Sequence, residues 1–324
     1  MAVEWDKKVD KSFPVKLKKY LDRFVVGQEE CKREAALAVF RHIYFGERRP
    51  FLVIGPSGCG KSLMFRALEG CPLIPKDYSI MCFDVARLTP EGTKGEDPLD
   101  IIKNFAKKCI LEDNKSRKGL IYLDEIDKIV MPSTMASGEN INASVQFQLM
   151  NFIEGEQVVG VDTKRILFAC GGAFTMLDEL WKQRKKKNPV GFSATKEEDK
   201  SLFSEATLRD DLIEVGAQKE FLGRITGIVQ NKALTRLQMK ALLVHPTRGI
   251  ISQKRESFRR IGLDFEINEE TVDWMVKEAI KENLGARSLN NVFEKILGNV
   301  EFDMLERGIS TVNINKEMML ERKK

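Results

Sequence analysis

The segment Gly55–Ser62, which reads Gly-Pro-Ser-Gly-Cys-Gly-Lys-Ser, constrains the fold of this chain more than any other. It fits the pattern G-x-x-x-x-G-K-[ST], follows the apolar run Phe51–Ile54 and precedes a segment of helical periodicity. A strand, a glycine-rich turn and a helix in this order place backbone N–H groups around a phosphate chain at a helix N-terminus. The segment therefore predicts an α/β domain that binds a nucleotide.

Each residue of this phosphate loop has an expected role. We expect nucleotide contacts from Gly55, Pro56, Ser57, Gly58, Cys59, Gly60, Lys61, Ser62 and Leu63. The Lys61 ammonium is expected to reach the β- and γ-phosphates, and the Ser62 hydroxyl to be a ligand of Mg²⁺. The loop thus predicts both a phosphate site and a metal site.

A pair of carboxylates ends a second apolar strand. The run Leu120–Leu123 is followed directly by Asp124 and Glu125. Successive strand residues point to opposite faces, so the two acids are expected to do different work. We predict that Asp124 orients hydrated Mg²⁺ and that Glu125 activates the water that attacks the γ-phosphate.

Buried strands alternate with helices through the first part of the chain. The four apolar runs are Phe51–Ile54, Ile80–Phe83, Leu120–Leu123 and Ile166–Cys170. This alternation predicts a parallel sheet covered on both faces. From about Lys232 the segments are helical, so we predict a large α/β domain over 1–231 and a smaller, mostly helical domain over 232–324. The polar stretch Trp181–Asp199 is expected to be an exposed loop.

Composition excludes several classes of protein. With 53 basic and 48 acidic residues among 324, the net charge of +5 does not favour a nucleic-acid-binding protein. Six scattered cysteines and two histidines argue against a disulfide framework, a zinc ribbon and a multi-histidine metal centre. There is no apolar run long enough for a membrane span and no signal-peptide pattern, so we expect a cytoplasmic protein without a membrane partner.

From about Leu17 to about Asp303 the chain resembles the AAA+ ATPases, and within them the ClpX-type unfoldases. Besides the phosphate loop, the resemblance is carried by Leu21–Glu29, Asp124–Ile129, Ile166–Phe174, Glu220–Arg224 and Gly285–Arg287. It implies a P-loop AAA+ domain followed by a helical AAA+ lid domain, with ATP and Mg²⁺ as cofactors. It also implies that Val26 contacts the adenine, that Arg224 is an arginine finger and that Arg287 is a second nucleotide sensor.

The resemblance further implies a ring, most plausibly a homo-hexamer. A guanidinium against the γ-phosphate neutralises charge that spreads over its oxygens in the transition state. If Arg224 lies at a subunit edge, each active site is shared, and the catalytic residues are Lys61, Glu125 and a neighbour's Arg224. Arg287 would then couple hydrolysis to rotation of one domain against the other.

Two loops concern partners. The tip Val190-Gly191-Phe192 resembles the family's loop that docks on a ClpP-type peptidase, and an exposed Phe flanked by charge suits such an anchor. The segment Gly92-Thr93-Lys94-Gly95 aligns with the pore loop, where the family carries an aromatic-aliphatic pair. Since Thr93 offers little area to grip a polypeptide, we expect weaker grip on arbitrary proteins.

The leading hypothesis is therefore an ATP-hydrolysing ring that unfolds protein substrates and delivers at least some of them to a ClpP-type peptidase. A stand-alone remodeller of a specific protein complex is the second hypothesis, and a regulator that competes for the ClpP docking surface is the third. A nucleic-acid motor is the least favoured, because no stacking aromatics interleave with the basic run Arg184–Lys187.

Overall fold

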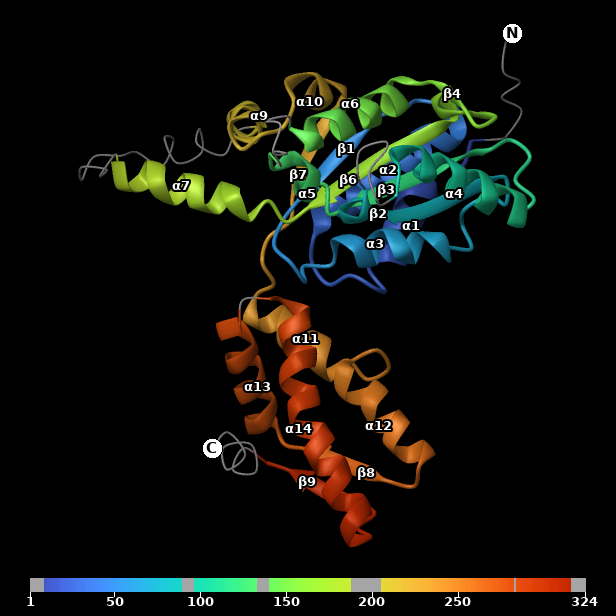
Figure 1. Ribbon diagram of the computed structural model, residues 1–324. Coiled ribbons are helices and arrows are strands. Elements are labelled where there is room, and N and C mark those ends of the chain that lie inside the picture. The colour runs from blue at the N-terminus through green and yellow to red at the C-terminus, as the bar shows by residue number, and fades with distance from the viewer. Residues whose placement is uncertain (1–8, 89–95, 133–139, 188–204, 283, 316–324) are drawn as a thin grey trace. The chain divides into compact units, whose positions relative to one another are not determined.

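The computed structural model describes residues 9–88, 96–132, 140–187, 205–282 and 284–315 (Figure 1). Contacts divide the chain into two compact units. The first comprises the residues up to Gly55 and Lys61–Asn231, and the second comprises the loop Pro56–Gly60 and the chain from Lys232 onward. Within the described residues, no helix is both long and apolar enough to cross a membrane.

A five-stranded parallel sheet forms the centre of the first unit. Its strands are β1 (Phe51–Ile54), β2 (Tyr78–Asp84), β3 (Lys118–Asp124), β6 (Ile166–Gly172) and β7 (Gly227–Gln230), in the order β2-β3-β6-β1-β7. The parallel sheet confirms the predicted α/β fold class. β7 is not among the predicted strands, because it is short and only half-buried. It forms by pairing with β1, with Gly227 opposite Phe51.

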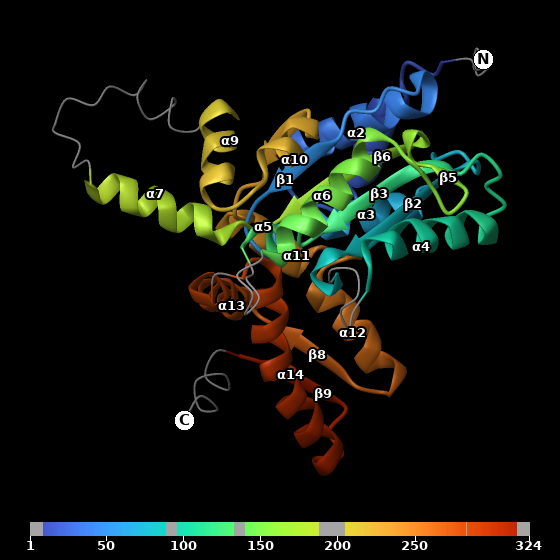
Figure 2. The ribbon, with the colours of Figure 1, turned by 45° about the horizontal axis from the view of Figure 1, so that its top comes forward.

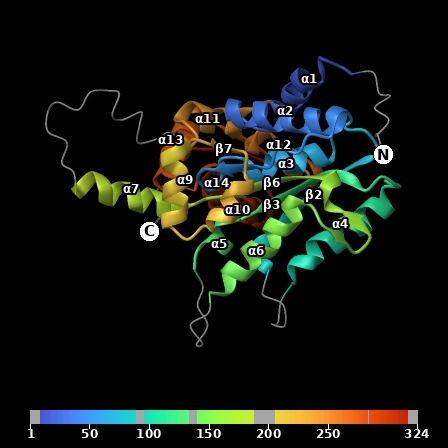
Figure 3. The ribbon, with the colours of Figure 1, turned by 90° about the horizontal axis from the view of Figure 1, so that it is seen from above.

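Helices cover both faces of this sheet. They are α1 (Phe13–Leu21), α2 (Glu29–Phe45), α3 (Lys61–Glu69), α4 (Pro98–Leu111), α5 (Asp127–Val130) and α6 (Ile141–Glu154). The unit also contains α7 (Thr175–Lys187), which extends away from the sheet in Figure 1, α9 (Glu205–Glu214), and α10 (Lys219–Arg224), which packs on α6. Side chains alternate along each strand, so Leu120 and Tyr122 of β3 pack with α1, α2 and α3, whereas Ile121 and Leu123 pack with α4, α5 and α6. Figure 3 shows α2 and α6 on opposite sides of the strands.

Smaller elements complete this unit. They are the antiparallel pair β4 (Gln157–Val158) and β5 (Val161–Asp162), and 3₁₀ turns at Val85–Arg87 and Thr163–Arg165.

The predicted exposed loop is wrong over its first part, because Trp181–Lys187 belongs to helix α7. The Trp181 indole N–H donates to Asp211 Oδ2 of α9 at 2.6 Å. Arg184 forms ion pairs with Asp211 and with Glu214, the latter at 2.6 Å. The buried Asp211 carboxylate thus holds α7 beside α9, as Figure 2 shows. The remainder of the predicted loop, 188–199, lies outside the described residues.

The second unit is mostly helical, as the sequence-based fold class predicts for the smaller domain. It contains α11 (Arg236–Val244), α12 (Ile250–Arg260), α13 (Glu269–Glu282), α14 (Ala286–Arg307) and the parallel strands β8 (Asp264–Ile267) and β9 (Thr311–Ile314). Its own hydrophobic core includes the buried side chains of Phe258, Phe265 and Phe293.

Candidate nucleotide site

The phosphate loop joins the end of β1 to the start of α3. The Gly55 N–H donates to Gly172 O of β6 at 3.2 Å, which fixes the point where the loop leaves the sheet. Gly58 and Gly60 have φ angles of 72° and 99°, a region that favours glycine. Lys61 is buried, and its ammonium donates to Gly55 O at 2.5 Å, across the loop. The loop therefore has the conformation and the positive charge that a phosphate group requires.

The predicted metal ligands fit Mg²⁺ in number and kind. Ser62 is half-buried in the first turn of α3, and Asp124 is the last residue of β3. Mg²⁺ keeps several waters and takes one or two protein oxygens together with substrate phosphates. Among the described residues, no group of three or more His, Cys, Asp or Glu side chains could hold a metal ion.

Asp124 is oriented by its neighbours. Its Oδ1 accepts hydrogen bonds from the Tyr122 hydroxyl at 3.2 Å and from the Glu125 N–H at 3.1 Å. The Tyr122 ring stacks on Phe65 of α3 with ring centroids 3.9 Å apart. Burial raises the pKa of the Tyr122 phenol, so the hydroxyl remains a donor. The strand that ends in the acid and the helix that follows the phosphate loop are therefore joined through one aromatic pair.

Glu125 lies outside the strand, in a left-handed turn with φ 56°. The direction of the Glu125 side chain is therefore not set by strand alternation. The prediction that the two acids point to opposite faces because both belong to a strand is wrong in its reason. The turn is attached to the end of β6 on both sides. The Ile126 N–H donates to Gly171 O at 2.9 Å, and buried Asp127 accepts the Ala173 N–H at 3.1 Å. A non-glycine residue with this backbone is uncommon and is often found at functional sites.

The glycine pair Gly171-Gly172 at the end of β6 joins the two halves of the site through its backbone. The Gly172 carbonyl receives the phosphate loop, and the Gly171 carbonyl receives the turn after Glu125. Side chains cannot be accommodated, because a β-carbon at Gly171 would overlap the Tyr122 hydroxyl and one at Gly172 would lie 2.6 Å from Asp127 Oδ1. The segment Ile166–Phe174 is one of those that carry the family resemblance, which does not by itself identify these carbonyls.

The predicted adenine-contacting segment lies between α1 and α2. Val26 is half-buried there, and Gly27 and Gln28 have positive φ angles. Lys32 on α2, which sequence reasoning did not single out, is 2% exposed and donates to Val25 O at 3.4 Å. The sequence does indicate that Lys32 is buried, because this lysine follows Cys31 and stands one turn before Ala35 and Ala36, on the apolar face of α2.

Lys32 is at the centre of a small ion cluster. Its Nζ contacts Asp22 Oδ1 at 2.5 Å and Glu29 Oε1 at 2.7 Å. Lys18 approaches the same two carboxylates, at 3.1 Å and 2.6 Å. Hydrogen bonds from Lys18 and Lys32 lower the pKa of Glu29. The cluster therefore joins the residue before the Val26 loop, Asp22, to the residue after it, Glu29.

The two predicted arginines lie in different units. Arg224 is the last residue of α10, is exposed, and forms an ion pair with Glu154 at the end of α6. Arg287 is exposed in the first turn of α14, in the second unit. The structure thus brings Lys61, Asp124 and Glu125 to one edge of the sheet, where β1 and β3 end. The predicted loops Gly92–Gly95 and Val190–Phe192 lie outside the described residues.

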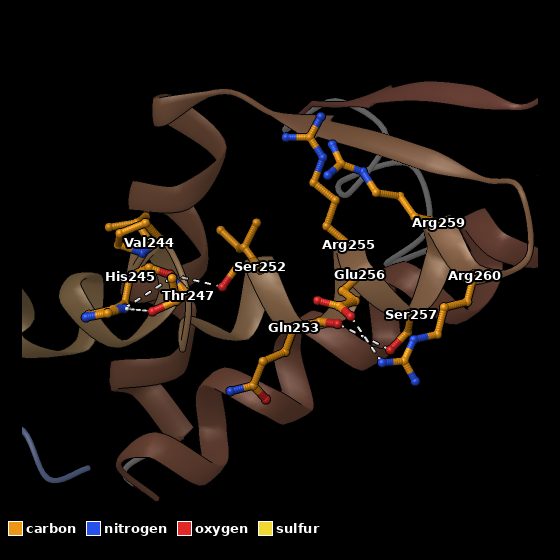
Figure 4. A pocket seen from close by; sticks show the side chains of 12 residues that line it. Val244, His245, Thr247, Ser252, Gln253, Arg255, Glu256, Ser257, Arg259 and Arg260 are labelled. Atoms are coloured by element: carbon orange, nitrogen blue, oxygen red, sulfur yellow. Dashed lines mark hydrogen bonds and ion pairs between the residues drawn. The ribbon is translucent and has the colours of Figure 1, made fainter. Parts of the chain in front are cut away.

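A hollow in the second unit is separate from these residues (Figure 4). It is lined by the turn Val244–Thr247 and by one side of α12. Arg255 and Arg259 both hydrogen-bond Asp264, at 2.6 Å and 3.0 Å, and lower the pKa of that carboxyl to about 2. These arginines already have an acidic partner within the second unit. None of the predicted site residues lines the hollow.

Comparisons with known proteins agree with the geometry. The sequence model of the AAA domain family (Cdc48 subfamily) matches residues 47–228. The chain is similar to the ATP-dependent Clp protease ATP-binding subunit ClpX of Treponema denticola, with 31% identity over 94% of this chain and 81% of the relative. The ClpX subunits of Borrelia duttonii and Borrelia recurrentis are each 29% identical over 95% of this chain and 78% of the relative.

Proposed function

Because this chain belongs to the ClpX-type AAA+ ATPases, and so hydrolyses ATP, we propose that it uses the hydrolysis to unfold protein substrates. The observation that supports this most directly is the pair of β6 carbonyls, which hold the phosphate loop and the Glu125 turn to a single strand end. Any movement of bound phosphate is then transmitted to the strand and to the helices packed on it. This is the mechanical connection that a motor needs.

In the proposed site the chain's own groups divide the work. The loop N–H groups and Lys61 bind the phosphates, while Ser62 and Asp124 hold Mg²⁺, partly through water. When bound there, the metal would neutralise charge on the phosphate oxygens. Glu125 takes the proton of the attacking water, and Val26 contacts the adenine.

We place the arginines in the same scheme. Arg224 acts on the nucleotide of a neighbouring subunit, so catalysis requires a ring, most plausibly a homo-hexamer. Its exposure at the end of α10 suits this role, and its ion pair with Glu154 would have to open for it. Arg287 senses the same nucleotide from the second unit. Supplying such a guanidinium in trans raises the rate by roughly 10³ to 10⁵ in GTPases.

The partners follow from two loops. We propose that Val190, Gly191 and Phe192 dock on a ClpP-type peptidase in the cytoplasm, and that Gly92–Gly95 lines the pore. The pair Thr93-Lys94, where an aromatic is expected, favours a second candidate function: a stand-alone ring that remodels one protein complex. A regulator that competes for the ClpP surface is less suited to a chain that hydrolyses ATP.

The test compares three variants. Glu125→Gln should bind ATP and form rings without turnover, and Arg224→Ala should bind ATP and hydrolyse it poorly. Glu125→Gln rings should sediment with ClpP from the same host only when ATP is present, and adding Phe192→Ala should abolish this. Full turnover in Arg224→Ala would contradict the shared site. Rings that form but do not bind ClpP would favour the stand-alone remodeller.

A further inference from the structure

The amide of Gln146, in the middle of α6, is fully buried and uses both of its ends. Its Nε2 donates to Ile129 O at 2.9 Å. Its Oε1 accepts the N–H of Gln218 at 2.8 Å, from a residue 72 positions away in the sequence. A buried side-chain amide with both ends occupied fixes the relative position of the two backbones that it joins.

Those two backbones carry different parts of the proposed reaction. Ile129 belongs to α5, which directly follows Glu125. Gln218 is the N-cap of α10, which ends at Arg224. One side chain therefore connects the segment of the proposed water activator to the helix of the proposed arginine finger. Figure 2 and Figure 3 both show α5, α6 and α10 side by side.

Neighbouring contacts strengthen the connection on the α5 side. Asn142, one turn before Gln146, donates to Lys128 O at 3.0 Å and to Met131 O at 2.6 Å. Gly216, two residues before Gln218, has a φ of 116°, and a β-carbon there would lie 2.6 Å from Val130 O. α5 is thus held along its length by α6 and by the turn that leads into α10.

The other end of α10 is held separately. Arg209 of α9 donates to Leu222 O at 2.9 Å and to Ile225 O at 2.8 Å. Phe221 and Leu222 of α10 are buried in the core, and Gln146 holds the N-terminal end of the helix through the Gln218 N–H. A helix of six residues has few hydrogen bonds of its own, so these side-chain contacts, together with the ion pair to Glu154, position Arg224.

We propose that Gln146 is a positioning residue that couples the Glu125 segment to Arg224, so that the state of a subunit's own nucleotide sets how it catalyses hydrolysis in its neighbour. This inference rests on the proposed function, because Arg224 has such a role only in a ring with shared sites. Gln146 touches no reacting atom. Its effect reaches the transition state through Arg224 and leaves the phosphate loop unchanged.

The test begins with Gln146→Met, which keeps the length of the side chain and removes all three of its hydrogen bonds, to Ile129 O, to Gly216 O and from the Gln218 N–H. We expect kcat for ATP to fall about tenfold, as for other small misplacements of catalytic groups, with KM nearly unchanged. Gln148→Met is the matched control: it makes the same change on the same helix, and Gln148 Oε1 has no hydrogen-bond partner among the described residues. Its kcat should stay within about twofold of the wild-type value.

A second variant tests the same link from the other side. Gln218→Pro removes the N–H that Gln146 accepts, and the native φ of −66° suits proline. It should lower kcat as Gln146→Met does while leaving the Ile129 contact in place. If Gln146→Met fails to fold, Gln218→Pro carries the test.

A double-mutant cycle separates positioning from general weakening of the fold. If Gln146 acts through Arg224, then Gln146→Met combined with Arg224→Ala should be no slower than Arg224→Ala alone. Effects that multiply, or a wild-type kcat in Gln146→Met beside an impaired Arg224→Ala, would overturn this inference and leave the proposed function standing. Full turnover in Arg224→Ala would overturn the shared site and this inference with it.

Discussion

Replacing Lys32 with methionine should weaken ATP binding far more than it slows hydrolysis at saturating ATP. The buried Nζ of Lys32 holds Asp22, Glu29 and Val25 O together at the two ends of the loop that contains Val26. Methionine fills nearly the same volume without the charge or the hydrogen bonds. The loop would then lose its anchor while the phosphate loop and Glu125 remain as they are.

The size of the effect follows from the exposure of the partners. Breaking a buried ion pair costs about 3–5 kcal/mol when the remaining charge stays buried. Here Asp22 and Glu29 are 38% and 60% exposed, so both return to water, and Lys18 still faces them. We therefore expect a loss of about 2 kcal/mol in the free energy of unfolding, equivalent to about 4–8 °C in Tm. If most of this loss falls on the loop conformation that we propose binds adenine, Kd for ATP rises about tenfold.

The assay is a titration with a fluorescent ATP analogue in Mg²⁺, beside thermal unfolding and steady-state turnover. Lys18→Met is the matched control, because Lys18 pairs with the same carboxylates, is itself 26% exposed, and has no contact to Val25 O in the described structure. Exposed pairs contribute less than about 1 kcal/mol, so its Kd should stay near the wild-type value. An unchanged Kd in Lys32→Met, or an equal loss in both variants, would refute the reasoning.

Three further predictions concern pH and grip. Burial lowers the pKa of His42 from 6.5 to about 3, so the unfolded chain binds a proton that the folded chain does not, and the free energy of unfolding should fall by up to about 1.4 kcal/mol per pH unit below pH 6.5. In urea unfolding between pH 7 and pH 5, His42→Phe should show a shallower pH dependence, and an equal slope would contradict this. The pKa of Asp264 is lowered to about 2, so its stabilising effect is present above pH 3.8 and is lost towards pH 2. The difference in Tm between wild type and Asp264→Asn should therefore shrink from pH 5 to pH 2; a constant difference would count against the Arg255 contact as its source. Thr93→Tyr should speed the ATP-dependent unfolding of a stable protein substrate, and no gain would argue against a weak grip at position 93.

The sequence predicts the sheet well where strands are buried on both faces. Phe51–Ile54 and Ile166–Cys170 are continuous apolar runs, and both are strands within the central sheet. β7 is not predicted in this way, because Gly227–Gln230 is half-buried and contains both apolar and polar residues. Its strand conformation comes from pairing with β1. Residues Trp181–Lys187, which the sequence predicts to be a loop, continue helix α7. The helix is held there by Asp211, thirty positions later, which accepts the Trp181 indole N–H.

The same distinction applies to the candidate site. The phosphate loop and the Asp124 strand are local patterns, so residue order alone places them at one edge of a parallel sheet. The left-handed turn at Glu125 and the buried amide of Gln146 depend on contacts between segments far apart in the chain. Hydrophobic periodicity carries no information about such hydrogen bonds, since the residues involved are polar and form no repeating pattern along the helix or turn.

The close approach of Tyr122 to Gly171 has a consequence for how this chain can evolve. The hydroxyl occupies the space that a side chain at position 171 would need, and it is also the group that orients Asp124. Alanine at 171 is therefore incompatible with tyrosine at 122, and phenylalanine would not relieve the overlap, because the ring carbons Cζ and Cε2 would still lie 2.7 Å and 2.9 Å from the new β-carbon. Across related sequences a side chain at position 171 should therefore occur only beside a residue smaller than an aromatic at position 122, and the two positions should change together.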